Sequence, residues 1–108
     1  MAKVMTICEL WLKLADGFAY GFGFGSSADA SKKAACTHAY QNVVPSVEAA
    51  VRQVNWCPDS CPVKIYRIDQ IGQSTVLFTF GFWRGSYFSL AQVPWTASVK
   101  CTSSKPPT

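Results

Sequence analysis

Phe18-Ala-Tyr-Gly-Phe-Gly-Phe-Gly25 decides the fold expected for this chain, because an aromatic residue alternates with Ala or Gly at every step. Side chains in a β-strand point alternately to opposite faces, so one face of this stretch is a row of rings and the other is almost bare backbone. The stretch therefore predicts a strand with two unequal faces. It names no activity by itself.

On the N-terminal side, residues 4–14 are rich in strand formers, and Asp16-Gly17 separates them from the aromatic strand. Asp-Gly favours a two-residue type I′ turn, because both residues tolerate positive φ. We therefore expect a hairpin in which opposed residues share a face. Its aliphatic face holds Cys8, Leu10, Leu12 and Leu14 beside Gly and Ala, and its aromatic face holds Glu9, Trp11, Lys13, Tyr20, Phe22 and Phe24.

The segment after this hairpin is helical in pattern. Ser26 or Ser27 can cap a helix, and the alanines that follow have high helix propensity. Pro45 breaks or kinks the helix, after which helical spacing resumes to about Asn55. We expect one bent or two-part helix on the aliphatic face, where the glycines permit a close approach.

Strand patterns return after residue 62. Strands are predicted over 63–70, 74–83 and 86–93, with a fourth over 96–101 after Pro94. The expected fold is α+β: an antiparallel sheet of five to six strands in the order ββ-α-βββ(β), with the helix on one face. Residues 1–101 form a single domain, and 102–108 are expected to be a disordered C-terminal tail.

The composition indicates a folded, unusually apolar domain. Of the 108 residues 49% are hydrophobic and 15% charged, which excludes a disordered chain, and the net charge is +4. No apolar stretch is long enough to span a membrane, and Glu9 and Lys13 interrupt the N-terminal region where a signal would lie. We therefore expect a cytoplasmic protein that does not enter a membrane.

The five cysteines are odd in number, so they cannot all pair within one chain. We expect them to be mostly reduced and buried, with a disulfide through Cys36 or between Cys57 and Cys61 as the alternative. Cys57 and Cys61 are also weak candidates for a metal site. Cys36 and His38 lie about 200° apart around a helix, which disfavours joint ligation or catalysis. No metal or cofactor is predicted.

No catalytic constellation is apparent. His38 is the only histidine, and the six acidic residues lie mainly at turns and helix ends, where capping explains them. The glycines at 21, 23 and 25 have strand spacing and do not form a phosphate-binding loop. We therefore expect a protein that is not an enzyme.

The aromatic face points away from the predicted helix. A helix is about 10 Å wide, whereas five strands span about 24 Å, so the helix can cover one face of the sheet at best. Burying four rings represents about 20 kcal/mol of gross hydrophobic free energy. We expect an interaction module that self-associates or binds a protein partner through this face, with Trp11, Tyr20, Phe22 and Phe24 as anchors and Glu9 and Lys13 as polar selectors.

Two other functions fit parts of the sequence. A small apolar ligand could enter a pocket between helix and curved sheet, lined by Phe78, Phe80, Phe82 and Tyr87. Tyr20-Gly-Phe-Gly-Phe24 resembles part of the strand signature of the RNA-recognition-motif family, and the expected hairpin before it and Ala-rich helix after it are similar to that family too. The resemblance covers about 20 residues and implies base stacking on the rings. This chain has Tyr20, Gly25 and Ser27 where that signature has a basic, an aliphatic and an aromatic residue, so nucleic acid is the less favoured partner.

Overall fold

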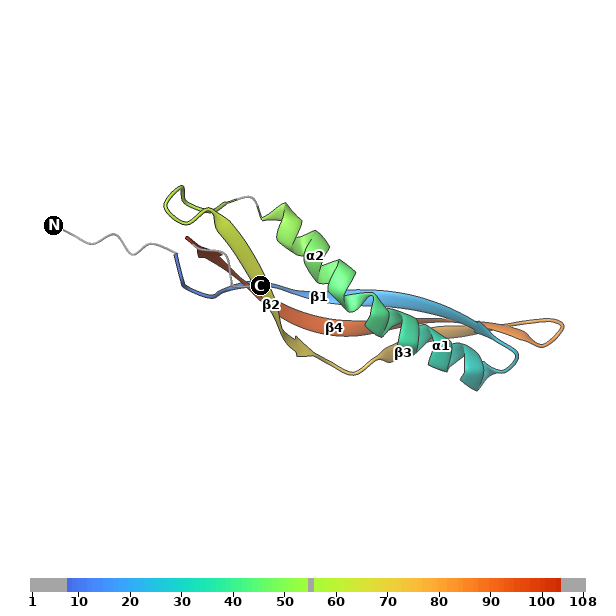
Figure 1. Cartoon of the computed structure of the whole chain (residues 1–108). Coiled ribbons are helices and arrows are strands. Elements are labelled where there is room, and N and C mark those ends of the chain that lie inside the picture. Colours follow the sequence, from blue (N-terminus) through green and yellow to red (C-terminus); the bar gives the residue numbers. More distant parts are fainter. Residues whose placement is uncertain (1–7, 55, 104–108) are drawn as a thin grey trace.

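The fold is α+β, with an antiparallel sheet and a bent helical layer. The computed structural model describes residues 8–54 and 56–103. Its elements are β1 (Leu12–Gly25), α1 (Ala28–Gln41), α2 (Val43–Gln53), β2 (Val63–Ile71), β3 (Thr75–Phe82) and β4 (Ser86–Thr102). Figure 1 shows the two helices, end to end, crossing one face of an elongated sheet. Neither helix of the described residues covers the opposite face.

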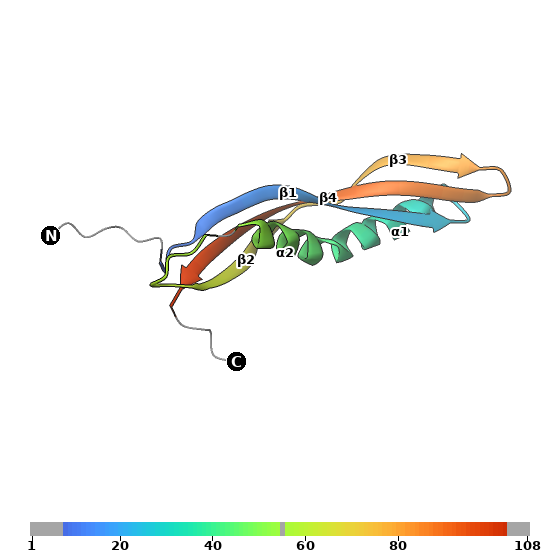
Figure 2. The ribbon, with the colours of Figure 1, turned by 90° about the horizontal axis from the view of Figure 1, so that it is seen from above.

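The sheet has four strands, not the five to six expected, and its order differs from the predicted one. β4 lies in the middle, with β1 antiparallel along one side. β2 and β3 follow one another along the other side of β4, β2 beside its C-terminal part and β3 beside its N-terminal part. Figure 2 shows β2 and β3 at opposite ends of β4. The sheet is therefore three strands wide along most of its length, and two strands wide at the gap between β2 and β3, opposite Val93 and Pro94.

The hairpin predicted at Asp16-Gly17 is wrong, because both residues lie inside β1. Gly17 pairs with Trp95 of β4, and a Cβ on Gly17 would come within 2.3 Å of the Trp95 ring. Asp16 accepts a hydrogen bond from Thr96 Oγ1 at 3.0 Å. The glycine thus makes room for a buried indole, and the strand continues through it.

The strand break expected at Pro94 is also wrong, since β4 runs through this residue. The Pro94 carbonyl accepts a hydrogen bond from Gly72 N–H at 2.8 Å, and Gly72 lies between β2 and β3. In an antiparallel ladder the nitrogen and oxygen of one residue face the same neighbour. The missing N–H of Pro94 therefore faces the gap between β2 and β3, where no ladder bond is lost.

The bent, two-part helix is confirmed. Ser27 Oγ accepts a hydrogen bond from Ala30 N–H at 3.1 Å and caps α1. α1 ends at Gln41, and α2 starts at Val43 after the single residue Asn42. Pro45 lies in the first turn of α2, the part of a helix in which proline is best tolerated.

The core lies between the helices and the Gly/Ala side of the sheet. A Cβ on Gly21 would lie 2.1 Å from the backbone nitrogen of Ala39, and one on Gly23 would lie 2.4 Å from that of Ala35. The backbones of α1 and β1 are therefore in direct contact. Valines fill the wider part of the core under α2: Val43, Val47 and Val51, with Val93 of β4.

Two disulfides overturn the expectation of reduced cysteines. Cys8 is bonded to Cys61, and Cys57 to Cys101. The alternatives considered from the sequence, a Cys57–Cys61 bond or one through Cys36, are also not formed. Cys57–Cys101 ties the loop before β2 to the C-terminal end of β4, and Cys8–Cys61 ties the same loop to the segment before β1. Cys36 keeps a free thiol.

Thr102, which was expected to be the first residue of a C-terminal tail, belongs to β4. Residues 104–108 of that tail lie outside the described residues. Neither helix in the described part of the chain combines the length and apolarity needed to cross a bilayer.

Candidate functional site: the open face of the sheet

We call the side of the sheet away from the helices the open face, and its ring-rich part the aromatic half. Phe24 pairs with Phe88, which pairs in turn with Phe80. Opposed residues share a face, so these rings form one row across β1, β4 and β3. The aromatic half consists of Phe18, Tyr20, Phe22 and Phe24 of β1, Phe78, Phe80 and Phe82 of β3, and Phe88 and Leu90 of β4.

Phe88 lies at the centre of the aromatic half. Its ring centroid is 5.0 Å from that of Phe24, 6.1 Å from that of Phe22 and 6.0 Å from that of Phe78. The seven rings on β1 and β3 are 41–64% exposed. The rings thus touch one another side by side, and their outer surfaces face solvent.

The six residues predicted as an interface do not lie together. Tyr20, Phe22 and Phe24 are in the aromatic half, as expected. Without the hairpin, Glu9, Trp11 and Lys13 continue along the line of β1 and reach the other end of the open face. Tyr20 is seven positions along the strand from Lys13, a distance of about 23 Å.

The predicted pocket residues are also divided. Phe78, Phe80 and Phe82 point away from the helices into the aromatic half. Tyr87 pairs with Gly25 and Gly81 and lies on the helix side of the sheet. These four residues therefore do not line one pocket between helix and sheet.

The aromatic half also contains Phe18, Phe88 and Leu90, which were not among the predicted site residues. Phe88 and Leu90 have the same two-residue spacing as the rings of β1. That spacing predicts a shared face within each strand. Which strands lie side by side depends on the topology, which the hairpin assumption misassigned.

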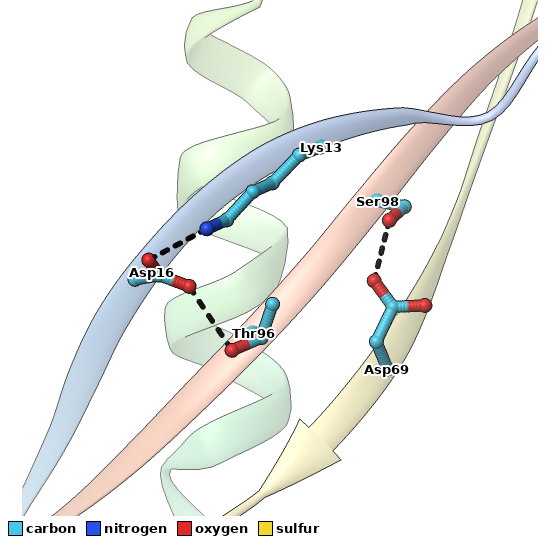
Figure 3. Close-up of polar contacts among 5 residues, drawn as sticks. All are labelled: Lys13, Asp16, Asp69, Thr96 and Ser98. Carbon is cyan, nitrogen blue, oxygen red and sulfur yellow. Dashed lines mark hydrogen bonds and ion pairs between the residues drawn. The ribbon is translucent and has the colours of Figure 1, made fainter.

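The other end of the open face is polar. Lys13 Nζ lies 2.8 Å from Asp16 Oδ2, and Asp16 also accepts from Thr96 Oγ1 (Figure 3). These two hydrogen bonds, that from Lys13 first, lower the pKa of the Asp16 carboxyl. The lysine charge is therefore balanced by an ionised carboxylate on its own strand.

A second carboxylate occupies the β2 side of this polar half. Ser98 Oγ donates a hydrogen bond to Asp69 (Figure 3), and Arg67 Nε lies 2.7 Å from Asp69 Oδ1. The bond from Ser98, followed by that from Arg67, lowers the pKa of Asp69. Arg67 is thus also paired with a carboxylate on its own strand.

The polar half ends at Trp11. The Arg67 guanidinium lies 4.3 Å from the ring centroid of Trp11, and Lys100 Nζ lies 5.0 Å from it. Lys100 is 3.6 Å from Glu9, whose pKa is lowered chiefly by a hydrogen bond from Thr102. Two cations therefore lie near the Trp11 ring, and each of them has an acidic partner.

Acid is expected to destabilise this polar half. A carboxyl whose folded pKa lies below its unfolded value stabilises the protein above the unfolded pKa, near 4, and loses that effect as the pH falls through the folded pKa. Glu9, Asp16 and Asp69 all shift in this direction. Urea unfolding at pH 6 and pH 3 should give a lower stability at pH 3, and Asp69→Asn should remove part of the difference. An equal pH dependence in Asp69→Asn would contradict the assignment for Asp69.

Side chains of α1 and the helix junction reach around the outer edge of β1. Phe22 N–H donates to His38 Nδ1 at 3.1 Å, and Asn42 Nδ2 donates to the Tyr20 carbonyl at 2.6 Å. These groups face away from β4, so they belong to the free edge of the sheet. His38 and Asn42 therefore occupy part of the edge at which another strand could otherwise pair.

The residues with catalytic or ligating chemistry are engaged elsewhere. His38 is bonded to the β1 edge, whereas Cys36 packs against the core. Cys57 and Cys61 are both in disulfides, so neither thiolate is free to bind a metal. Within residues 8–54 and 56–103 no group of three or more His, Cys, Asp or Glu side chains is placed to hold a metal ion.

Comparison with protein-family models, curated proteins and solved structures gives no match. The open face is the feature of this fold with the most distinctive chemistry.

Proposed function

We propose that the protein is a non-enzymatic association module that binds another protein surface through the aromatic half of its open face. The observation that carries the proposal is a group of nine aromatic or aliphatic side chains over three strands, with the polar Gln92 opposite Tyr20 and with neither helix of the described residues above them. β1 from Phe18 onward, all of β3, and β4 up to Pro94 contain no charged residue. Such a surface is suited to apolar contact.

The size of the aromatic half supports a protein partner. An aromatic side chain has about 150–250 Å² of surface, so seven rings at about half exposure present roughly 700 Å². The largest apolar patch on a typical monomer is about 300–600 Å² and is often functional. A sheet normally has a second layer over each apolar face, and the helices supply a layer for one face only.

Nucleic acid is the weaker alternative. Proteins that stack bases on aromatic side chains also carry free cations that track the phosphates. The cations of the open face lie in the polar half, and each has a carboxylate partner: Lys13 with Asp16, Arg67 with Asp69 and Lys100 with Glu9. The rings therefore have no cationic groove beside them.

A small apolar ligand is also less well supported. Ligand sites for small molecules are concave and enclose most of the ligand. Hollows in the described part of the chain lie at the β2–β3 gap, beside the loop at Cys57, beside α2 and at Trp11. None of these four is lined by the rings of the aromatic half.

The disulfides are informative about the compartment in which the module associates with its partner. Cytosolic proteins rarely keep structural disulfides, because thiol reductants hold their cysteines reduced. Two disulfides in one small domain favour an oxidising compartment over the cytoplasm expected from the composition. We propose that the module associates with its partner in such a compartment.

Site-specific photo-crosslinking tests the association surface. A benzophenone amino acid placed at Phe80, which is 57% exposed, should form adducts with a protein chain on irradiation, in purified protein and in an extract of the producing cells. The matched control places the same group at Val44, which is 47% exposed on α2. Mass spectrometry should find protein adducts at Phe80 and few at Val44.

The competing functions predict other products in the same experiment. Adducts with nucleic acid or a small molecule alone would replace the proposal with one of the alternatives. Equal protein adducts at Phe80 and Val44 would show that the reagent reacts without regard to the surface, and the proposal would fail.

A further inference from the structure

We infer that the partner is a second copy of this chain, stacked through the aromatic half so that two sheets form a closed sandwich; this inference rests on the proposed function. Two antiparallel sheets pack face to face at about 10 Å when their inner faces are apolar. The aromatic half offers such a face. A second copy supplies an identical one.

The exposed area matches what a stable dimer needs. Each partner in a standard protein interface buries about 800 Å². The rings of the aromatic half present roughly 700 Å² of exposed surface, and Trp83 at the adjacent hairpin tip is 85% exposed. A flat partner that covers the rings and Trp83 would therefore bury about the area of a standard interface. No other part of the molecule is needed to reach that area.

Charge does not oppose a second copy at the rings. The chain has a net charge of +4, so two copies repel wherever their charged residues meet. The strand segments that carry the rings contain no charged residue. In a two-fold dimer the same patch faces itself, and here that contact brings no like charges together.

Pairing of strand edges does not explain the exposed rings. Part of the β1 edge is already occupied by His38 and Asn42. Addition of a strand at the β3 edge would extend the sheet in its own plane and leave the aromatic half as exposed as before. Only a layer above the open face covers the rings.

The polar half determines how the two copies overlap. Full-length stacking would bury three ion pairs of each copy, and desolvation costs several kcal/mol per ion. The two copies therefore overlap through the aromatic halves only, with antiparallel strands and with their polar halves pointing in opposite directions. β4 is about 56 Å long, and the paired sheets would extend over about 80 Å.

Sedimentation equilibrium of the purified, oxidised full chain tests the inference. The wild type should be a dimer. Phe80→Asp, which places one carboxylate per copy inside the interface, should weaken dimerisation by about 100-fold or more. Val44→Asp makes the same change of charge at an exposed apolar residue on the other side of the molecule, and it should leave the dimer unchanged.

A second position separates loss of association from loss of folding. Phe24→Asp changes the most exposed ring of β1, at 64%. Both ring variants should keep the circular dichroism spectrum and melting temperature of a folded monomer, because these rings lie outside the core between helices and sheet. A dimer that persists in two folded ring variants would overturn the inference.

Other outcomes separate the inference from the function on which it rests. A monomeric wild type that still gives crosslinks from Phe80 to a different chain would overturn self-association and leave the association module standing.

Small-angle scattering tests the overlap of the two copies. A dimer no longer than one copy would overturn the antiparallel half-overlap, whereas a longest dimension increased by about half supports it.

Discussion

Gly21→Ala is expected to lower the free energy of unfolding by about 3 kcal/mol or more, enough to unfold a marginally stable domain. A Cβ at Gly21 would lie 2.1 Å from the backbone nitrogen of Ala39 and 2.6 Å from the carbonyl oxygen of Ala35. Backbone atoms cannot move aside as a side chain can. The methyl group would force α1 away from β1 along their closest contact. Urea unfolding followed by circular dichroism measures the loss.

Gly81→Ala is the matched control for this change. Gly81 is a strand glycine between two aromatic residues, like Gly21, but the nearest atoms to an added Cβ would be those of the Tyr87 ring, at 3.1 Å. A side chain can shift by a few tenths of an ångström, so we expect an effect below about 1 kcal/mol. Equal stability of the two variants would contradict the direct contact between α1 and β1.

The part of the fold that local pattern encodes was predictable. The alternation of rings with Gly and Ala from Phe18 to Gly25 predicted one face for the helix and one open face, and the register of β1 on β4 bears this out. Ser26 or Ser27 was predicted to cap the helix, and Ser27 does so; Pro45 predicted a break, which lies three residues earlier, at Asn42. Each inference needs only neighbours in sequence, because side-chain direction follows from backbone geometry.

The errors concern residues whose role is set by distant partners. Asp16-Gly17 has the sequence of a turn, yet Gly17 is needed because Trp95, far along the chain, lies against it. Pro94 has the sequence of a strand break, yet its missing donor coincides with a gap in the neighbouring strand. Such compensation cannot be recognised before the topology is known.

In the candidate site, too, the features set by local sequence were predictable and those set by distant partners were not. Tyr20, Phe22 and Phe24 were identified from their own strand, and Phe78, Phe80 and Phe82 were recognised as one row. Only the topology brings these two rows together over β4, through Phe88. The wrong hairpin placed Glu9 and Lys13 on the same surface as these rings, whereas in the structure they lie toward the other end of β1.

The loss of either disulfide is expected to lower the free energy of unfolding by about 4 kcal/mol. The bonds join residues 53 and 44 positions apart in sequence, so each restricts a long loop of the unfolded chain. The effects need not add, because both bonds constrain overlapping parts of the chain. Cys8→Ser with Cys61→Ser, and separately Cys57→Ser with Cys101→Ser, should each shift the urea midpoint strongly downward.

Cys36→Ser is the control, because it removes a thiol that belongs to no disulfide. It should cost about 1 kcal/mol, and alkylation under denaturing conditions should detect one free thiol in the wild type and none in this variant. Five reactive thiols in the native protein, or cysteine pairs removed without loss of stability, would contradict the disulfides and with them the oxidising compartment.

The disulfides lie far from the aromatic half, so their effect on stability can be measured apart from association through the rings. Both bonds lie at the end of the sheet that carries the polar half, and Cys101 is about 36 Å along β4 from Leu90. A variant that lacks one bond but is still folded should therefore keep the dimerisation constant of the wild type, measured by sedimentation below its unfolding midpoint. Weaker association in such a folded variant would mean that the polar end also contacts the partner, contrary to an overlap confined to the rings.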